Sequence, residues 1–156
     1  MPNSKLKVDI LVIALSSPLL IGVYSDKRLI NSITREGKSS DLFATLFEDI
    51  LDEYDVTGLY YANGPGSFMS IKMGYVFLSA LSIAKDIPLF ATDAFAFNNN
   101  TPIKAIGKNH YIKENNAIIM KMIGDSVKSE AFALPQKLES GAFNMNHQPL
   151  YIAPAV

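Results

Sequence analysis

A glycine-rich turn joins a short apolar strand to an almost uncharged helix near the middle of this 156-residue chain, in the run Gly64-Pro65-Gly66-Ser67-Phe68. Two glycines around a proline let the backbone turn sharply and lie close to a ligand or a second chain. Ser67 or Ser70 can cap the helix that follows. A strand, a glycine turn and a helix in this order can also hold a phosphate at the helix N-terminus.

The turn does not match three familiar glycine motifs. A Walker loop ends in Gly-Lys-Ser or Gly-Lys-Thr, which is absent here, and a dinucleotide fingerprint needs a third glycine where Met69 stands. A nucleophile elbow needs glycines two residues on either side of its serine, whereas Ser67 has Pro65 and Met69 there. Spacing alone therefore leaves a structural and a functional role of the turn open.

The composition excludes several kinds of site. A net charge of -1 and a pI near 6.1 predict no strongly basic surface for direct binding of nucleic acid or anionic membrane. The chain has no cysteine, so disulfides and thiolate metal sites are excluded. His110 and His147 are predicted to be exposed loop residues rather than metal ligands. The absence of cysteine and the two histidines predicted to lie in exposed loops lead us to expect no metal site. The apolar runs are judged too short to span a bilayer, and no signal-peptide cleavage pattern precedes the first strand, so we expect a cytoplasmic protein.

Apolar runs separated by turn-rich connections predict a mixed sheet. The first three runs are expected to form consecutive antiparallel strands, followed by a helix capped by Ser39 or Ser40, a fourth strand, a second helix and a fifth strand. A strand-helix-strand crossover gives parallel neighbours, so we expect helices on the faces of this sheet. The predicted strands cover residues 8–15, 19–24, 29–34, 58–62 and 88–92, and the helices cover residues 41–54 and about 68–84.

The character of the chain changes after Asp93. A polar linker at residues 98–102 is followed by three brief apolar pieces, at residues 103–106, 111–112 and 117–123, which are predicted to form a small appended sheet. From residue 124 onward, prolines and polar residues predict irregular structure that is either partly disordered or laid over the main domain. We therefore divide the chain into a first domain, residues 1–97, and a truncated second subdomain, residues 98–156.

The helix after the glycine turn is apolar on two sides. A helix that rests on a sheet needs only one apolar stripe, so a second stripe calls for additional cover. That cover is either a second chain or the preceding helix packed beside it within one chain. The two stripes are Ile71, Tyr75, Leu78 and Leu81, and Met73, Phe77, Ala80 and Ala84.

The segment from Gly64 to Gly74 resembles GPGSFTGLRIG, the hallmark of the TsaB proteins, a YeaZ-like and glycoprotease-related family. Gly64 to Phe68 and Gly74 match, Ile71 to Met73 are conservative replacements, and Asp86 to Leu89 stand where the family's next strand begins. The resemblance covers roughly residues 1–95, and the remaining tail is much shorter than the family's second domain. It implies an α/β, ribonuclease-H-like (actin/ASKHA-type) mixed sheet of three antiparallel strands, then helix-strand-helix-strand, with a truncated second subdomain.

The resemblance also implies a role and partners. TsaB proteins scaffold and activate TsaD in the bacterial complex that forms threonylcarbamoyl-adenosine at position 37 of tRNA, with TsaE assisting indirectly. The chain would bind TsaD, form a homodimer when alone, and reach tRNA only through the complex. The interface residues implied are Phe68, Ile71, Tyr75, Leu78, Leu42 and Leu46. Gly64, Pro65, Gly66 and Ser67 would shape the loop, where ATP or ADP can lie at the boundary with TsaD. Lys72, which stands where the family has arginine, would either hold a phosphate or cover an apolar edge with its stem.

Chemistry of its own is not expected of this chain. Where the family has Asp-Thr-Ser at the end of the first strand, the sequence reads Ala14-Leu15-Ser16, so no carboxylate can hold a metal bound to phosphates there. The family's histidine before the first helix is also missing, and Asp93 is predicted to be a cap. The remaining acidic residues of the first helix, Glu48, Asp49, Asp52 and Glu53, are predicted to be solvated.

The leading hypothesis is therefore a non-catalytic subunit that requires no cofactor itself. One alternative is an ATP-dependent enzyme or peptidase of the same superfamily. Another is a stand-alone homodimeric interaction module that has lost the connection to tRNA.

Overall fold

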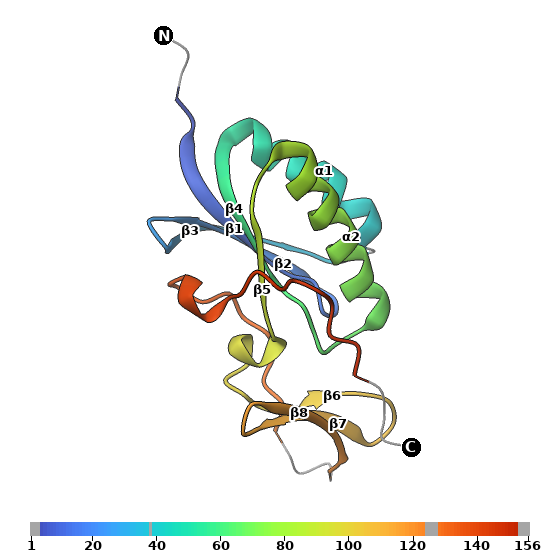
Figure 1. Ribbon diagram of the computed structural model, residues 1–156. Helices are drawn as coiled ribbons and strands as arrows, with labels where there is room; N and C mark the ends of the chain where they lie inside the picture. Colours follow the sequence, from blue (N-terminus) through green and yellow to red (C-terminus); the bar gives the residue numbers. More distant parts are fainter. Residues whose placement is uncertain (1–3, 38, 124–127, 153–156) are drawn as a thin grey trace.

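One mixed sheet and two helices make up the larger part of the molecule (Figure 1). The computed structural model describes residues 4–37, 39–123 and 128–152. The sheet has the order β3-β2-β1-β4-β5, in which β1, β2 and β3 are antiparallel neighbours and β4 is parallel to both β1 and β5. This confirms the predicted mixed α/β sheet. The elements are β1 (Leu6–Ile13), β2 (Leu19–Ser25), β3 (Arg28–Arg35), α1 (Ser39–Glu53), β4 (Tyr54–Ala62), α2 (Phe68–Lys85) and β5 (Leu89–Thr92).

Most elements begin or end one to four residues from the predicted bounds, and β1 covers Leu6–Ile13 rather than residues 8–15. The helix α1 begins at Ser39, so Ser39 and Ser40 lie inside the helix rather than at the residue before it. Strand β4 begins at Tyr54, directly after α1, and not at Gly58. Its first residues alternate between exposed Asp55 and Thr57 and buried Val56, and they pair with the start of β1, which extends the strand.

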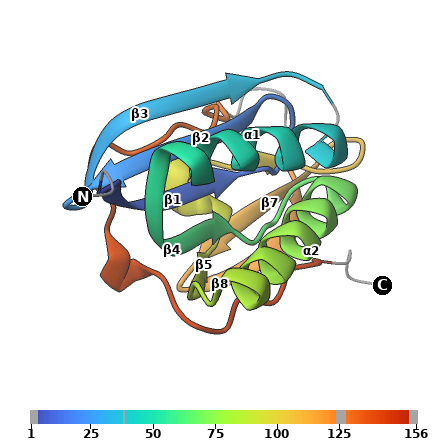
Figure 2. The same cartoon turned by 90° about the horizontal axis from the view of Figure 1, so that it is seen from above.

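The buried strand β1 divides the core into two layers because its side chains alternate between the faces of the sheet. Ile10 and Val12 lie in one layer with Phe43 of α1 and Leu78 of α2. Both helices therefore cover the same face, side by side (Figure 2), rather than the two faces that were expected.

The opposite face is covered by irregular chain and a short helix. Leu11 and Leu15 pack there with Leu138 and with Phe95 of the 3-10 helix η1 (Ala94–Phe97). Residues 128–152 run back over this part of the molecule, with one short 3-10 helix, η2 (Ser140–Ala142). This confirms the predicted irregular covering segment for those residues, whereas residues 124–127 and 153–156 lie outside the described part.

A second, three-stranded antiparallel sheet follows η1, as predicted. It consists of β6 (Ile103–Lys104), β7 (Asn109–Glu114) and β8 (Ala117–Met122) in the order β6-β7-β8. Lys113 of β7 forms an ion pair of 2.5 Å with Asp93, and Asp93 also caps η1 as expected by accepting a hydrogen bond from the Phe95 amide. His110 lies half-buried in β7, so its prediction as an exposed loop residue is wrong.

Helix α2 has the length and mean hydropathy, 1.2, that a membrane-spanning helix would also have, contrary to the expectation that every apolar run is too short. Its contacts are those of a helix layered on a sheet. Ile71, Gly74 and Leu78 are buried, and Phe77 lies between Phe43 and Phe47 of α1 with both pairs of ring centroids 5.2 Å apart. The second apolar stripe is thus covered within the chain at Phe77, whereas Ala80 and Ala84 of the same stripe are exposed.

Candidate functional site

The glycine turn, residues 63–67, is held by two separate backbone segments. The Ser67 amide donates to the Leu15 carbonyl at the end of the first strand, at 2.9 Å. On the other side, the Leu150 amide donates to the Asn63 carbonyl at 2.7 Å. Ser67 accepts a hydrogen bond from the Ser70 amide at 3.4 Å, so Ser67 is the helix cap of the two serines considered.

Both glycines are required by these close approaches. Gly64 has a φ of +122°, a conformation that side chains disfavour, and a Cβ atom there would lie 2.7 Å from the Leu150 carbonyl oxygen. A Cβ atom on Gly66 would lie 2.9 Å from the carbonyl oxygen of Leu15. Gly64 and Pro65 are buried, so the accessible part of the turn is limited to Gly66 and Ser67.

Residues 144–152, here called the C-terminal strap, cross the ends of β4 and β5. Asn144 exchanges two backbone hydrogen bonds with Ala91 of β5, at 2.9 and 3.0 Å. The buried Tyr61 hydroxyl donates to the carbonyl of His147, and the Asn63 amide group donates to the carbonyl of Gln148 at 2.9 Å. The strap is therefore fixed to the sheet by several independent hydrogen bonds.

The strap also meets α2. The Gln148 side chain donates to the Tyr75 hydroxyl at 3.2 Å, and the ring of Tyr151 packs edge-on against Phe68 with centroids 5.3 Å apart. His147 is half-buried beside Tyr75, so its prediction as an exposed residue is also wrong. The strap therefore forms one border of the surface that α2 presents to solvent.

An outer face of α2 remains uncovered among the described residues. It consists of Phe68, Met69, Lys72, Val76, Ala80 and Ile83. Phe68 is 50% exposed, Met69 64%, Val76 55% and Ile83 83%. These positions recur every three to four residues, so they form one continuous stripe on the helix. An apolar stripe of this kind is typical of a surface that binds another protein.

The residues expected at an interface divide into two groups. Ile71 and Leu78 of α2 and Leu46 of α1 are buried within the chain, where they contact the core. Leu42 and Tyr75 are partly buried, and Phe68 is exposed. Helical spacing could indicate apolar stripes but not which of them the sheet would cover. The exposed Met69, Val76 and Ile83 were consequently not singled out from the sequence.

The end of the first strand has no acidic side chain. Ala14 and Leu15 are both buried, and Ala14 lies beside Gly74 and Phe43. Ser16 is exposed, and Lys72 lies on the outer face of α2 near Tyr151. Within residues 4–37, 39–123 and 128–152, no three histidine, cysteine or acidic side chains come together in a way that could hold a metal ion.

Among the residues that the structure describes, burial and ion pairing shift the pKa of three titratable groups. Burial raises the pKa of the Tyr61 hydroxyl, with a smaller contribution from Tyr75 and Tyr151, and burial also raises the pKa of Tyr24. A hydrogen bond to Asp9, at 2.7 Å, raises the pKa of Lys27. Tyr24 joins β2 to Pro135 of the covering segment, Tyr61 joins β4 to the strap, and Lys27 joins the β2–β3 turn to β1. None of the three belongs to the outer face of α2.

Comparison with solved structures gives the same fold in two proteins. YeaZ from Pseudomonas aeruginosa superposes with a TM-score of 0.58 at 14% sequence identity, covering 83% of this chain and 71% of that one. A crystal structure of an uncharacterised protein with similarity to the peptidase YeaZ from Pseudomonas aeruginosa has a TM-score of 0.56 at 12% identity, covering 96% of this chain and 85% of that one. No protein-family model matches the sequence, and no curated protein matches it significantly. The similarity to the TsaB (YeaZ-like) proteins is thus confirmed for the fold: this chain folds as YeaZ does.

Proposed function

We propose that this chain is a non-catalytic subunit of the complex that forms threonylcarbamoyl-adenosine in tRNA, and that the outer face of α2 binds the catalytic subunit TsaD. The outer face is the observation that carries the proposal, because four large apolar side chains lie exposed along one helix. The fold shared with YeaZ and the TsaB-like glycine turn support the choice of partner. We also assign the sheet to the ribonuclease-H-like class and the protein to the cytoplasm as parts of this proposal.

The proposed absence of catalysis rests on the two places where chemistry would be expected. Ala14 and Leu15 are buried apolar residues where a metal-binding carboxylate would stand. Ser67 caps α2, and within the described chain its hydroxyl makes no hydrogen bond to a histidine, lysine or acidic side chain that would activate it. The chain would therefore act by contact.

The same face would mediate self-association in the absence of TsaD. Lys72 is the only charged residue between Phe68 and Ile83, so two copies of this face would repel each other only weakly. ATP or ADP at the boundary with TsaD would contact the exposed Ser67 and Lys72, because Gly64 lies against the strap and Pro65 is buried. tRNA would be reached only through the complex.

A binding measurement between this chain and TsaD of the same organism tests the proposal. Val76→Asp places a charge in the middle of the outer face, and Ile30→Asp makes the same kind of change at an exposed position of β3. We expect Val76→Asp to weaken binding at least tenfold and Ile30→Asp to leave it unchanged, with both variants folded by circular dichroism. Absence of binding by the unmodified chain, or equal binding by Val76→Asp, would refute the proposed contact.

A further inference from the structure

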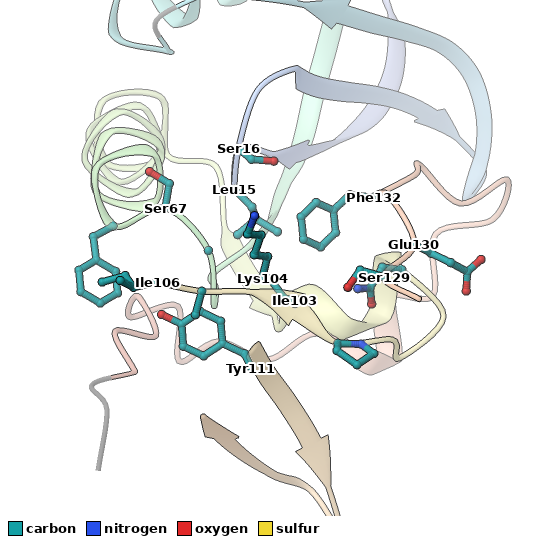
Figure 3. A pocket seen from close by; sticks show the side chains of 15 residues that line it. Leu15, Ser16, Ser67, Ile103, Lys104, Ile106, Tyr111, Ser129, Glu130 and Phe132 are labelled. Carbon is teal, nitrogen blue, oxygen red and sulfur yellow. The ribbon is translucent and has the colours of Figure 1, made fainter. Parts of the chain in front are cut away.

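A pocket of about 570 Å³ lies between the end of the first strand and the second sheet (Figure 3). Leu15, Gly66 and Ser67 line it from the side of the glycine turn. Ile103, Tyr111 and Phe132 line it from the opposite side. Its volume is within the range of pockets that hold small molecules, roughly 300–1,000 Å³. Ser67, the proposed nucleotide contact, and Phe68 of the outer face of α2 also line this pocket, but none of the roles proposed above uses the cavity itself.

The walls are mainly apolar and aromatic. Leu15, Ile103 and Tyr111 are each buried, and the Phe132 ring lies beside Leu15 and Ile103 in the close view. Leu15 is the residue that replaces the threonine of the TsaB pattern, so its side chain adds apolar surface here. Such walls favour a ligand with an aromatic or branched apolar body.

One buried polar atom in the wall lacks a partner. Asn98 is 2% exposed, and its amide group donates to the Thr101 carbonyl at 3.0 Å. Its side-chain oxygen Oδ1 has no hydrogen-bond partner among the described residues, and Asn98 lines the pocket. A buried acceptor left unpaired costs about 1–3 kcal/mol. A ligand with an N–H donor would supply the missing hydrogen bond.

The charges around the pocket differ between its two sides. Helix α2, which has 18 residues, begins at Phe68, and its N-terminus borders the pocket next to Ser67. Lys104 adds a positive charge, so this side favours an anion. Glu130 lies on the other side of the pocket from Ser67 in Figure 3 and is bound to the Asn99 side chain at 3.1 Å. With one lysine on one side and one glutamate on the other, the pocket favours a ligand with a single negative charge over a polyphosphate.

We propose that this pocket binds a small aromatic molecule with one anionic group and one N–H donor. The aromatic body lies among Leu15, Tyr111 and Phe132. The anionic group lies toward the N-terminus of α2 and Lys104, and the N–H group donates to Oδ1 of Asn98. This site shares only Phe68 with the outer face of α2 and does not depend on the identity of the protein partner.

The fluorescent probe 8-anilinonaphthalene-1-sulfonate has an aromatic body, one sulfonate and one N–H group, so it tests the inference directly. Its binding is measured by fluorescence titration of the full chain. Ala105→Phe fills the pocket from its wall, whereas Ala117→Phe makes the same change at an exposed position of β8. We expect one site per chain, at least tenfold weaker binding by Ala105→Phe, and no change for Ala117→Phe.

Three further comparisons test where and how the probe binds. Val76→Asp should leave binding unchanged, because the outer face of α2 is not the proposed site. The N-methylated probe, which lacks the N–H donor, should bind at least fivefold more weakly, and ATP with magnesium should not compete. If Ala105→Phe does not fold, Ser129→Trp blocks the pocket from its opposite side and should have the same effect.

Four results would overturn the proposal. Equal binding by the pocket variants, or loss of binding in Val76→Asp, would place the probe elsewhere. Equal binding of the N-methylated probe would remove Asn98 as its partner. Effective competition by ATP would contradict the selection for a single negative charge.

Discussion

Gly64 lies against Leu150 so closely that a Cβ atom at position 64 would be 2.7 Å from the Leu150 carbonyl oxygen. The glycine turn and the C-terminal strap are thus one structural unit, although 86 positions separate the two residues along the sequence. The hydrogen bond from the Leu150 amide to the Asn63 carbonyl, at 2.7 Å, holds the same pair of segments. The first glycine of the motif is explained by this contact.

Gly64→Ala should lower the free energy of unfolding by about 1–3 kcal/mol, because the added methyl group meets a backbone atom and the φ of +122° is strained for alanine. Urea unfolding measures the change. Gly141→Ala is the control, since nothing lies within 4 Å of its added Cβ atom. Equal stability of the two variants would mean that the strap does not lie on the turn.

Phe77→Ala should destabilise the chain by about 2–4 kcal/mol, since Phe77 fills the contact between α2 and the Phe43 and Phe47 rings of α1. Ile83→Ala on the outer face of the same helix should change stability by less than about 0.5 kcal/mol, because Ile83 is exposed. Thermal unfolding of both variants measures the difference. A large loss on Ile83→Ala and none on Phe77→Ala would contradict the assignment of the helix faces.

In the Tyr61→Phe variant, the free energy of unfolding should fall less steeply with rising pH above pH 10 than in the unmodified chain. The pKa of the buried Tyr61 is raised above its ordinary value of 10.0, so above pH 10 the unfolded chain releases this proton while the folded chain retains it. The free energy of unfolding therefore falls as the pH rises, by up to about 1.4 kcal/mol per pH unit for one proton. Tyr24 and Lys27, whose pKa values are also raised, act in the same direction and remain in the variant.

Urea unfolding between pH 8 and 11 compares the slopes of the two proteins. The variant also loses the hydrogen bond to the His147 carbonyl, so its stability at pH 8 should be lower by about 1 kcal/mol. Parallel slopes above pH 10 would show that Tyr61 is not buried in the folded chain.

Met69→Asp should reduce self-association of the isolated chain, because Met69 is an exposed residue of the outer face. The variant should lose no more than about 1 kcal/mol of stability, because a carboxylate in the first turn of α2 interacts favourably with the helix dipole. Sedimentation equilibrium measures association, and Ile30→Asp is the matched control on β3. If unmodified protein forms dimers that Met69→Asp does not weaken, the dimer uses another surface.

The sequence was sufficient for the sheet but not for the site. The alternation of Ile10, Leu11, Val12 and Ile13 along β1, with turn residues between the first three strands, indicated a buried strand in a mixed sheet. The Phe68–Lys85 helix was also predictable from its apolar spacing. Which stripe faced the sheet was not predictable, because nearly every position of α2 is apolar and burial then depends on where α1 lies.

The strap was beyond sequence reasoning for a different reason. Its attachment uses backbone groups of Asn144, His147 and Leu150, and backbone hydrogen bonds leave no residue pattern. The unpaired oxygen of Asn98 was equally hidden, since the residue stands in a polar run that reads as an exposed linker. A run of polar residues after an apolar strand gave no signal that one of them would be buried.

Reconstituted threonylcarbamoyl transfer to tRNA tests the central claim most directly. TsaD and TsaE of the same organism are assayed without this chain, with the unmodified chain, and with Val76→Asp, and the modified nucleoside is quantified by mass spectrometry. The account predicts modification that depends on the unmodified chain and falls to the chain-free level with Val76→Asp. Equal modification without the chain would contradict its assignment as a subunit of this machinery.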